Sequence, residues 1–176
     1  MEIQIIIPWG SNGNLGAAYN RLMESVTDWV CFLDHDILQL NPNWYHICRS
    51  AIKTVGHSAG WITGVTNAIA CPSQYCPDAP KNNDVIDHMR YAKKRYNQFE
   101  DNLFLVDPTT IGLEFSGFMI LTHKSAWEKT GGFENGFLGI DNAYFRGITK
   151  TGHKAYIIPG LYMYHTYGQK KSWDTF

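Results

Sequence analysis

Two short runs of apolar residues near the N-terminus have the length and composition of buried strands. Residues 3–7 form a β-branched run that ends at Pro8, and residues 29–33 form a second apolar run. Short apolar runs of this kind are typical of strands covered on both faces. Over residues 15–26, apolar residues recur at helical spacing, with one stripe formed by Leu15, Ala18, Leu22 and Val26. The pattern predicts a strand, a turn, a helix and a second strand.

The remaining sequence predicts further helices and strands in alternation. Helices are expected over residues 44–55, 85–98, 125–130 and 141–150. Strands are expected over residues 60–66, 117–121 and 155–158, with a last strand-like run at residues 162–164. Residues 67–84 are rich in Pro, Asn and Asp and predict a long loop, and residues 133–139 predict a glycine-bearing loop. This alternation indicates one mixed α/β domain.

Composition narrows the classes of protein that fit these elements. The 176 residues are 44% hydrophobic and 18% charged, which suits one globular domain. The net charge of −1 gives no global basic field for nucleic acid or a membrane. Neither a membrane helix nor a signal peptide is expected, because the apolar stretches are strand-sized and no basic segment precedes them. The four cysteines form no disulfide framework and no zinc pattern. We expect a soluble, cytoplasmic protein with reduced thiols.

Two aspartates stand directly after the second predicted strand, in Asp34-His35-Asp36. The carboxyl end of a strand is where open α/β sheets place their ligands. Two carboxylates in one turn can converge on a hard cation, which takes oxygen ligands and bridges to phosphates. The motif therefore predicts an Asp-x-Asp site for a metal ion and a diphosphate. The alternative is a strand-end turn in which the aspartates only accept backbone hydrogen bonds.

Three further features carry candidate chemistry. Ser116 and Gly117 put small residues before a predicted strand, where a ligand could approach the backbone. Asp141 follows the glycine-bearing loop and stands at the start of a predicted helix. His165 comes directly after the last strand-like run. Each feature alone is a weak indication of function, and their order along the chain is more specific.

The order and spacing of these motifs resemble the nucleotide-sugar glycosyltransferases of the GT-A fold. Asn14-Leu15-Gly16-Ala17-Ala18-Tyr19-Asn20, followed by Asp34-His35-Asp36, is similar to a stretch of family 2. A second group of motifs is similar to the second half of the family 2 sequences and to the β-1,4-galactosyltransferases. It consists of Phe115-Ser116-Gly117, Gly131-Gly132-Phe133 and the acidic helix start. The resemblance implies a single GT-A domain, a minimal Rossmann-like version over residues 1–176. Residues 1–66 would bind nucleotide sugar and metal, residues 67–110 would form a variable acceptor-side insert, and residues 111–176 would form the acceptor and catalytic half.

The resemblance also implies a reaction and residue roles. The reaction is metal-dependent, inverting transfer of a sugar, of the hexosyltransferase type, from a nucleotide-diphosphate sugar, with UDP expected. Asp36 and His165 would hold Mn²⁺ or Mg²⁺, Asp34 would share this metal ion or contact the ribose, and Asp141 would be the catalytic base. The residues implied in donor binding are Pro8, Trp9, Gly10, Asn14, Asn20, Asp34, Ser116 and Gly117. The alternatives are an ordinary strand-end histidine for His165 and a helix N-cap for Asp141.

Two departures from the family pattern are visible. Ile140 stands where the family has an acidic residue before Asp141, and the strand–helix–strand unit that usually precedes the Asn-Leu-Gly segment is missing. Trp9 could replace part of that unit by stacking on the nucleotide base. These departures leave two alternatives: a nucleotide- or sugar-binding domain without turnover, and a nucleotidyltransferase of similar topology.

The sequence leaves the acceptor and the oligomeric state open. A glycan fits the resemblance. Arg90, Lys93 and Lys94 fall on one face of a predicted helix and could hold an anionic acceptor such as nucleic acid. The alternative for this basic face is that it is only solvated.

Overall fold

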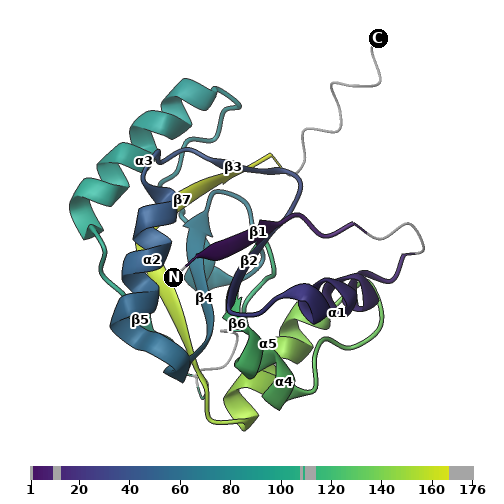
Figure 1. The fold of residues 1–176 in the computed structure, drawn as a ribbon. Helices are drawn as coiled ribbons and strands as arrows, with labels where there is room; N and C mark the ends of the chain where they lie inside the picture. Colours follow the sequence, from purple (N-terminus) through teal and green to yellow (C-terminus); the bar gives the residue numbers. More distant parts are fainter. Residues whose placement is uncertain (1, 10–12, 108, 110–113, 167–176) are drawn as a thin grey trace.

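The structure is a computed structural model that describes residues 2–9, 13–107, 109 and 114–166. Within these residues the chain forms one α/β domain, in which five α-helices pack on a mixed seven-stranded sheet (Figure 1). The strands are β1 (Ile3–Ile6), β2 (Trp29–Leu33), β3 (Ile37–Gln39), β4 (Ala59–Thr66), β5 (Phe104–Leu105), β6 (Met119–His123) and β7 (Lys154–His165). The helices are α1 (Leu15–Ser25), α2 (Trp44–Val55), α3 (Val85–Phe99), α4 (Lys124–Thr130) and α5 (Ile140–Lys150). Two 3-10 turns cover Gly56–Ser58 and Pro72–Gln74.

Strand direction brings several strand ends to one edge of the sheet. The order is β1-β2-β6-β4-β7-β3, and β5 also pairs with β7. β1 is parallel to β2, β4 is parallel to β7, and β6 lies antiparallel between β2 and β4. The carboxyl ends of β1, β2, β4 and β7 therefore share one edge with the start of β6. Because β3 is antiparallel to β7, its first residue reaches this edge as well.

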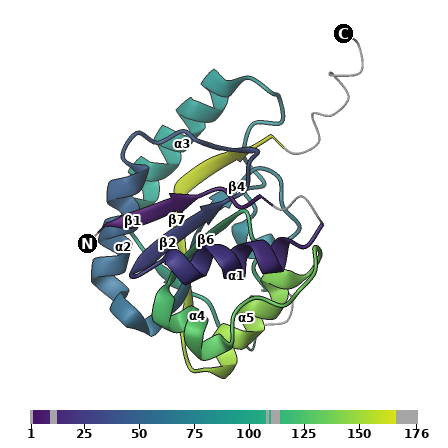
Figure 2. The same cartoon turned by 45° about the vertical axis from the view of Figure 1, so that its right-hand side comes forward.

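Alternating side chains divide the core into two layers. Along β2, Val30 and Phe32 belong to one hydrophobic cluster, and Cys31 and Leu33 belong to the other. Helices α1 and α5 contribute to the first cluster, with α4 beside them, and α2 contributes to the second (Figure 2). Helix α3 packs along β7. Coverage of both faces explains why the central strands are continuous apolar runs.

The buried face of α1 differs from the stripe expected from the sequence. The fully buried residues of the helix are Gly16, Ala18, Tyr19 and Met23, whereas Leu15 and Leu22 are only partly buried. The inner face is therefore centred near Tyr19. The aromatic ring of Tyr19 packs in the core on the face where the sequence pattern predicted leucine side chains.

Several element boundaries also differ from expectation. The two runs expected near residues 155–164 form the single strand β7, in which Pro159 and Gly160 lie where the pairing with β4 shifts register. A proline is tolerated there because a bulge does not need its missing N–H. β6 begins at Met119, two residues later than expected. β3 and β5 were not predicted, because two or three residues are too few to show a period.

The four cysteines are free thiols in buried positions: Cys31, Cys48, Cys71 and Cys76. Burial raises the pKa of the Cys31 and Cys48 thiols, so these two remain protonated and act as small apolar side chains. In the segments that the structure describes, no helix has both the length and the apolar content needed to cross a membrane.

Candidate active site

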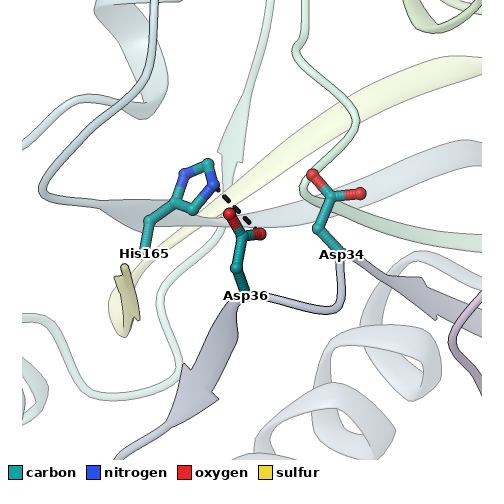
Figure 3. A group of neighbouring side chains, drawn as sticks. All are labelled: Asp34, Asp36 and His165. Carbon is teal, nitrogen blue, oxygen red and sulfur yellow. Dashed lines mark ion pairs between the residues drawn. The ribbon is translucent and has the colours of Figure 1, made fainter. Parts of the chain in front are cut away.

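The three candidate metal ligands lie together at the sheet edge where the parallel strands end. Asp34 follows β2, Asp36 precedes β3, and His165 is the last residue of β7. Their ligand atoms lie within 4.8 Å of one another (Figure 3). The Asp34 N–H donates to the Phe118 carbonyl at 3.0 Å, which ties the aspartate turn to β6. The structure thus gathers the residues that the sequence suggested as metal ligands.

The short strand β3 is what places Asp36 beside His165. Ile37 pairs with His165 in an antiparallel ladder. One step further along, Thr166 donates to the Asp36 carbonyl from its N–H at 2.9 Å and from its hydroxyl at 3.1 Å. The His165 N–H donates to Asn67 Oδ1 at 2.8 Å. These bonds fix the register, and a slip of one residue would turn the side chains to the other face.

The surroundings of the His165 ring determine which nitrogen can bind a cation. Nδ1 lies 2.7 Å from the Ala68 carbonyl oxygen, which only accepts hydrogen bonds, so Nδ1 carries a proton. Nε2 lies 3.3 Å from Asp36 Oδ1. Two acceptor atoms at this distance repel each other unless a proton or a metal ion lies between them. One imidazole nitrogen and two carboxylates suit Mn²⁺ or a similar divalent ion.

Asp34 lies in an unfavourable place for an isolated negative charge. Burial and the nearby Asp36 carboxylate raise the pKa of Asp34 from 3.8 to about 6, against smaller opposing effects of His165 and His35. The Asp141 carboxylate adds to the increase. A divalent cation would offset this accumulated charge, so the electrostatics favour a bound metal ion at neutral pH.

Asp141 lies near this group, in the first turn of α5. The helix begins at Ile140 with Gly139 as its N-cap, so the alternative interpretation of Asp141 as the N-cap is wrong. Its Oδ2 accepts from the Gly117 N–H at 2.9 Å, and its Oδ1 accepts from the Asn142 N–H at 2.9 Å. A Cβ on Gly117 would lie 3.1 Å from the Asp141 Cβ, which leaves little room for a larger residue. These contacts orient the carboxylate against the start of β6.

A cavity of about 140 Å³ lies between Asp34 and Asp141. Its apolar walls include Tyr19, Phe137 and Leu138, and the last two are 62% and 87% exposed. Burial, followed by the carboxylates of Asp34 and Asp141, raises the pKa of Tyr19 far above its ordinary value. The Tyr19 hydroxyl therefore stays protonated. Apolar walls with a few converging polar groups are typical of a small-molecule site.

Asn20 fixes the start of the loop that leads to Asp141. Its Oδ1 accepts from the Phe133 N–H at 2.8 Å and from Trp127 Nε1 at 2.9 Å. Its Nδ2 donates to the Phe133 carbonyl at 2.8 Å. The side chain was expected to contact the donor, and here its amide binds Phe133 and Trp127. A direct contact between Asn20 and a nucleotide sugar stays a prediction.

Asn14 and Gly16 hold the middle of the same loop. Asn14 Oδ1 caps α1 by accepting from the Ala17 N–H at 3.0 Å, and it also accepts from the Gly136 N–H at 2.9 Å. The Gly16 N–H donates to the Gly136 carbonyl at 3.0 Å. A Cβ on Gly16 would lie 1.8 Å from the Glu134 carbonyl oxygen, so only glycine allows this approach. The Asn-Leu-Gly segment therefore positions the loop before Asp141.

The remaining residues expected to bind the donor lie at or near the same edge. Pro8 and Trp9 follow β1, and the Trp9 side chain is 74% exposed. Gly10 lies outside the described residues. The Ser116 backbone is held by a buried glutamine that the sequence did not single out, since Gln74 Oε1 accepts from its N–H at 2.8 Å and Nε2 donates to its carbonyl at 3.0 Å.

The basic face of α3 is exposed. Arg90 pairs with Asp87 on the same helix at 2.9 Å, and Lys93 and Lys94 are both exposed to solvent. This arrangement is typical of a solvated helix face. An anionic acceptor at this face stays a prediction.

Comparisons with models of known protein families and with curated protein sequences find no match for this chain. Function is therefore inferred from the geometry of the site and from the sequence motifs.

Proposed function

We propose that the chain is a minimal GT-A glycosyltransferase that transfers a sugar, with inversion, from a nucleotide-diphosphate sugar to an acceptor hydroxyl in the presence of Mn²⁺ or Mg²⁺. One observation carries the proposal. The Asp34, Asp36 and His165 ligand atoms lie within 4.8 Å of one another, and Asp34 also lines a cavity with Asp141. A cation site and a separate carboxylate on one cavity are the two groups that this transfer needs.

The donor diphosphate would lie at the cation site. Asp36 and His165, from the ends of β3 and β7, would hold the ion together with Asp34. When bound, the ion would supply positive charge to the diphosphate oxygens as the bond to the sugar breaks. Trp9 follows the neighbouring strand β1 and would offer its exposed ring to the nucleotide base. UDP remains the expected nucleotide.

Asp141 would take the proton of the acceptor. The acceptor oxygen attacks the anomeric carbon, the bond from that carbon to the diphosphate oxygen breaks, and the nucleoside diphosphate leaves. The hydroxyl proton passes to Asp141. Each Asp141 oxygen accepts one backbone hydrogen bond and has a second acceptor position, so the carboxylate can receive a proton while it is held in place. Attack opposite the leaving group inverts the anomeric carbon.

The test is UDP release from a panel of UDP-sugars with Mn²⁺, measured beside UDP affinity. Asp36→Ala and His165→Ala should lose both UDP release and the metal dependence of UDP binding. Asp141→Asn should keep UDP affinity and lose on the order of 10²-fold or more in turnover. Glu24→Ala and His46→Ala replace exposed residues and should behave as wild type. Unchanged turnover in all three site variants would refute the proposal.

A second candidate is a binding domain without turnover. Its support is that Asp141 has a structural role, because its carboxylate links Gly117 and Asn142 to the start of α5. In that case UDP and Mn²⁺ bind, no UDP-sugar is cleaved, and Asp141→Asn lowers the unfolding temperature. Cleavage by the wild-type protein excludes this candidate.

A further inference from the structure

Tyr19 is a buried residue that lines the cavity between Asp34 and Asp141. Its side chain is only 3% exposed, and Tyr19 lines the cavity together with both aspartates. Among the residues that the structure describes, the Tyr19 hydroxyl has no hydrogen-bond partner. The hydroxyl is not among the enclosed polar atoms that lack a partner in the described residues, which are Gln39 Oε1 and Arg49 Nε. It is therefore accessible on an otherwise buried side chain, and it can bind a polar group of a molecule in the cavity.

The ring of Tyr19 is held firmly, so the direction of its hydroxyl is fixed. The ring stacks on Phe133 with centroids 4.6 Å apart and meets the edge of Phe32 at 4.8 Å. Phe133 in turn stacks on Tyr144, with centroids 4.1 Å apart. The Tyr144 hydroxyl is bound to Thr122 Oγ1 at 2.9 Å inside the core. Two tyrosines therefore flank one phenylalanine, and of their hydroxyls only that of Tyr144 has a hydrogen-bond partner within the described parts of the chain.

We propose that the Tyr19 hydroxyl donates a hydrogen bond to an oxygen of the sugar that is transferred. The proposal rests on the proposed function, and it assigns the cavity to the sugar of the donor. The anomeric carbon must lie between the departing diphosphate and the proton acceptor. In this chain that place is the cavity between the cation site at Asp34 and the carboxylate of Asp141.

The size and chemistry of the cavity fit one sugar ring. Its volume of about 140 Å³ is well below the roughly 300 Å³ at which drug-sized sites begin, so a single ring is the largest group that it suits. The carboxylates of Asp34 and Asp141 only accept hydrogen bonds, whereas a sugar presents both donors and acceptors. The Tyr19 hydroxyl would supply a hydrogen-bond donor in the same cavity. Phe137 and Leu138 add apolar surface for the C–H face of the ring.

The experiment compares Tyr19→Phe with Tyr144→Phe, which removes a hydroxyl from the other side of Phe133. Calorimetry with Mn²⁺ measures the affinity for UDP and for the UDP-sugar that the wild-type protein binds most tightly, among UDP-glucose, UDP-galactose and UDP-N-acetylglucosamine. Tyr19→Phe should bind UDP as the wild type does and should bind the UDP-sugar about three- to tenfold more weakly, the range for one neutral hydrogen bond. Its unfolding midpoint should not fall. Tyr144→Phe should show a lower unfolding midpoint and an unchanged ratio of the two affinities.

The outcomes separate this inference from the proposed function. A wild-type protein that binds neither UDP nor any UDP-sugar refutes the proposed function, and the assignment of Tyr19 with it. A wild-type protein that binds both, with a Tyr19→Phe variant that has the same ratio of affinities, refutes the assignment of Tyr19 alone. Equal weakening of UDP and UDP-sugar binding in Tyr19→Phe also refutes it, because the hydroxyl would then act through the fold.

Discussion

Replacing Asp34 by Asn should stabilise the metal-free protein at neutral pH. The Asp34 carboxyl has a pKa of about 6 in the folded chain, against 3.8 for the ordinary group. The folded state therefore binds this proton more tightly than the unfolded state does. The free energy of unfolding falls as the pH rises from about 4 to about 6, and above that range the full penalty is present. Asn removes the charge and with it the penalty.

The magnitude follows from the difference between the two pKa values. The interval from 3.8 to about 6 corresponds to roughly 3 kcal/mol, since one pH unit is about 1.4 kcal/mol. Asp34 is only half-buried, so water screens part of the penalty of its charge. We therefore expect the free energy of unfolding to rise by about 1–3 kcal/mol for Asp34→Asn at pH 8. At pH 4 the gain should be small. In the described residues, the hydrogen bonds of Asp34 come from its backbone, which Asn retains.

The assay is urea denaturation in EDTA at pH 4 and pH 8, with Glu24→Gln as a control that removes an exposed carboxylate from α1. Adding Mn²⁺ should raise the unfolding midpoint of the wild-type protein more than that of Asp34→Asn, because a ligand that binds only the folded state stabilises it. A variant that is no more stable than wild type at pH 8 in EDTA would refute the electrostatic account of Asp34.

Two further predictions concern the loop before Asp141. Asn20→Ala removes three hydrogen bonds to Phe133 and Trp127 and should lower the free energy of unfolding by about 2–4 kcal/mol, measured by urea denaturation; a loss below about 0.5 kcal/mol would contradict the role of Asn20. Gly16→Ala should destabilise the protein by more than about 2 kcal/mol, because its Cβ would meet Glu134. The matched change Gly147→Ala in α5 meets only Thr130 at 3.4 Å and should be neutral or stabilising, and equal effects of the two changes would contradict the close approach at Gly16.

Local signals in the sequence were sufficient for some of the strands and helices and for the aspartate pair of the site. β2 and α2 match their predicted ranges, since an apolar run and a helical period are each complete within the segment. The Asp-x-Asp turn follows from the end of β2. The meeting of Asp36 with His165 could not be derived from spacing, because it depends on the pairing of β3 with the end of β7.

Other parts of the site depend on contacts between distant segments. Tyr19 was not predicted to line a cavity, because the expected stripe of α1 was centred on leucines rather than on the face that packs against Phe133. Asn14 and Asn20 were assigned to the donor from a motif, and a motif does not show that their amides bind residues 133–136. The contact of Gln74 with the Ser116 backbone was not predicted, because a glutamine in a Pro-rich segment has the sequence pattern of an ordinary loop residue.

The most direct test of the proposed cation site is anomalous diffraction from crystals soaked with MnCl₂ and UDP. The account predicts one manganese peak within about 2.5 Å of an Asp36 carboxylate oxygen and of His165 Nε2, with His165 Nδ1 still bound to the Ala68 carbonyl and the UDP diphosphate on the ion. A manganese peak away from Asp36 and His165, or UDP bound at this edge with no ion beside it, would contradict the account.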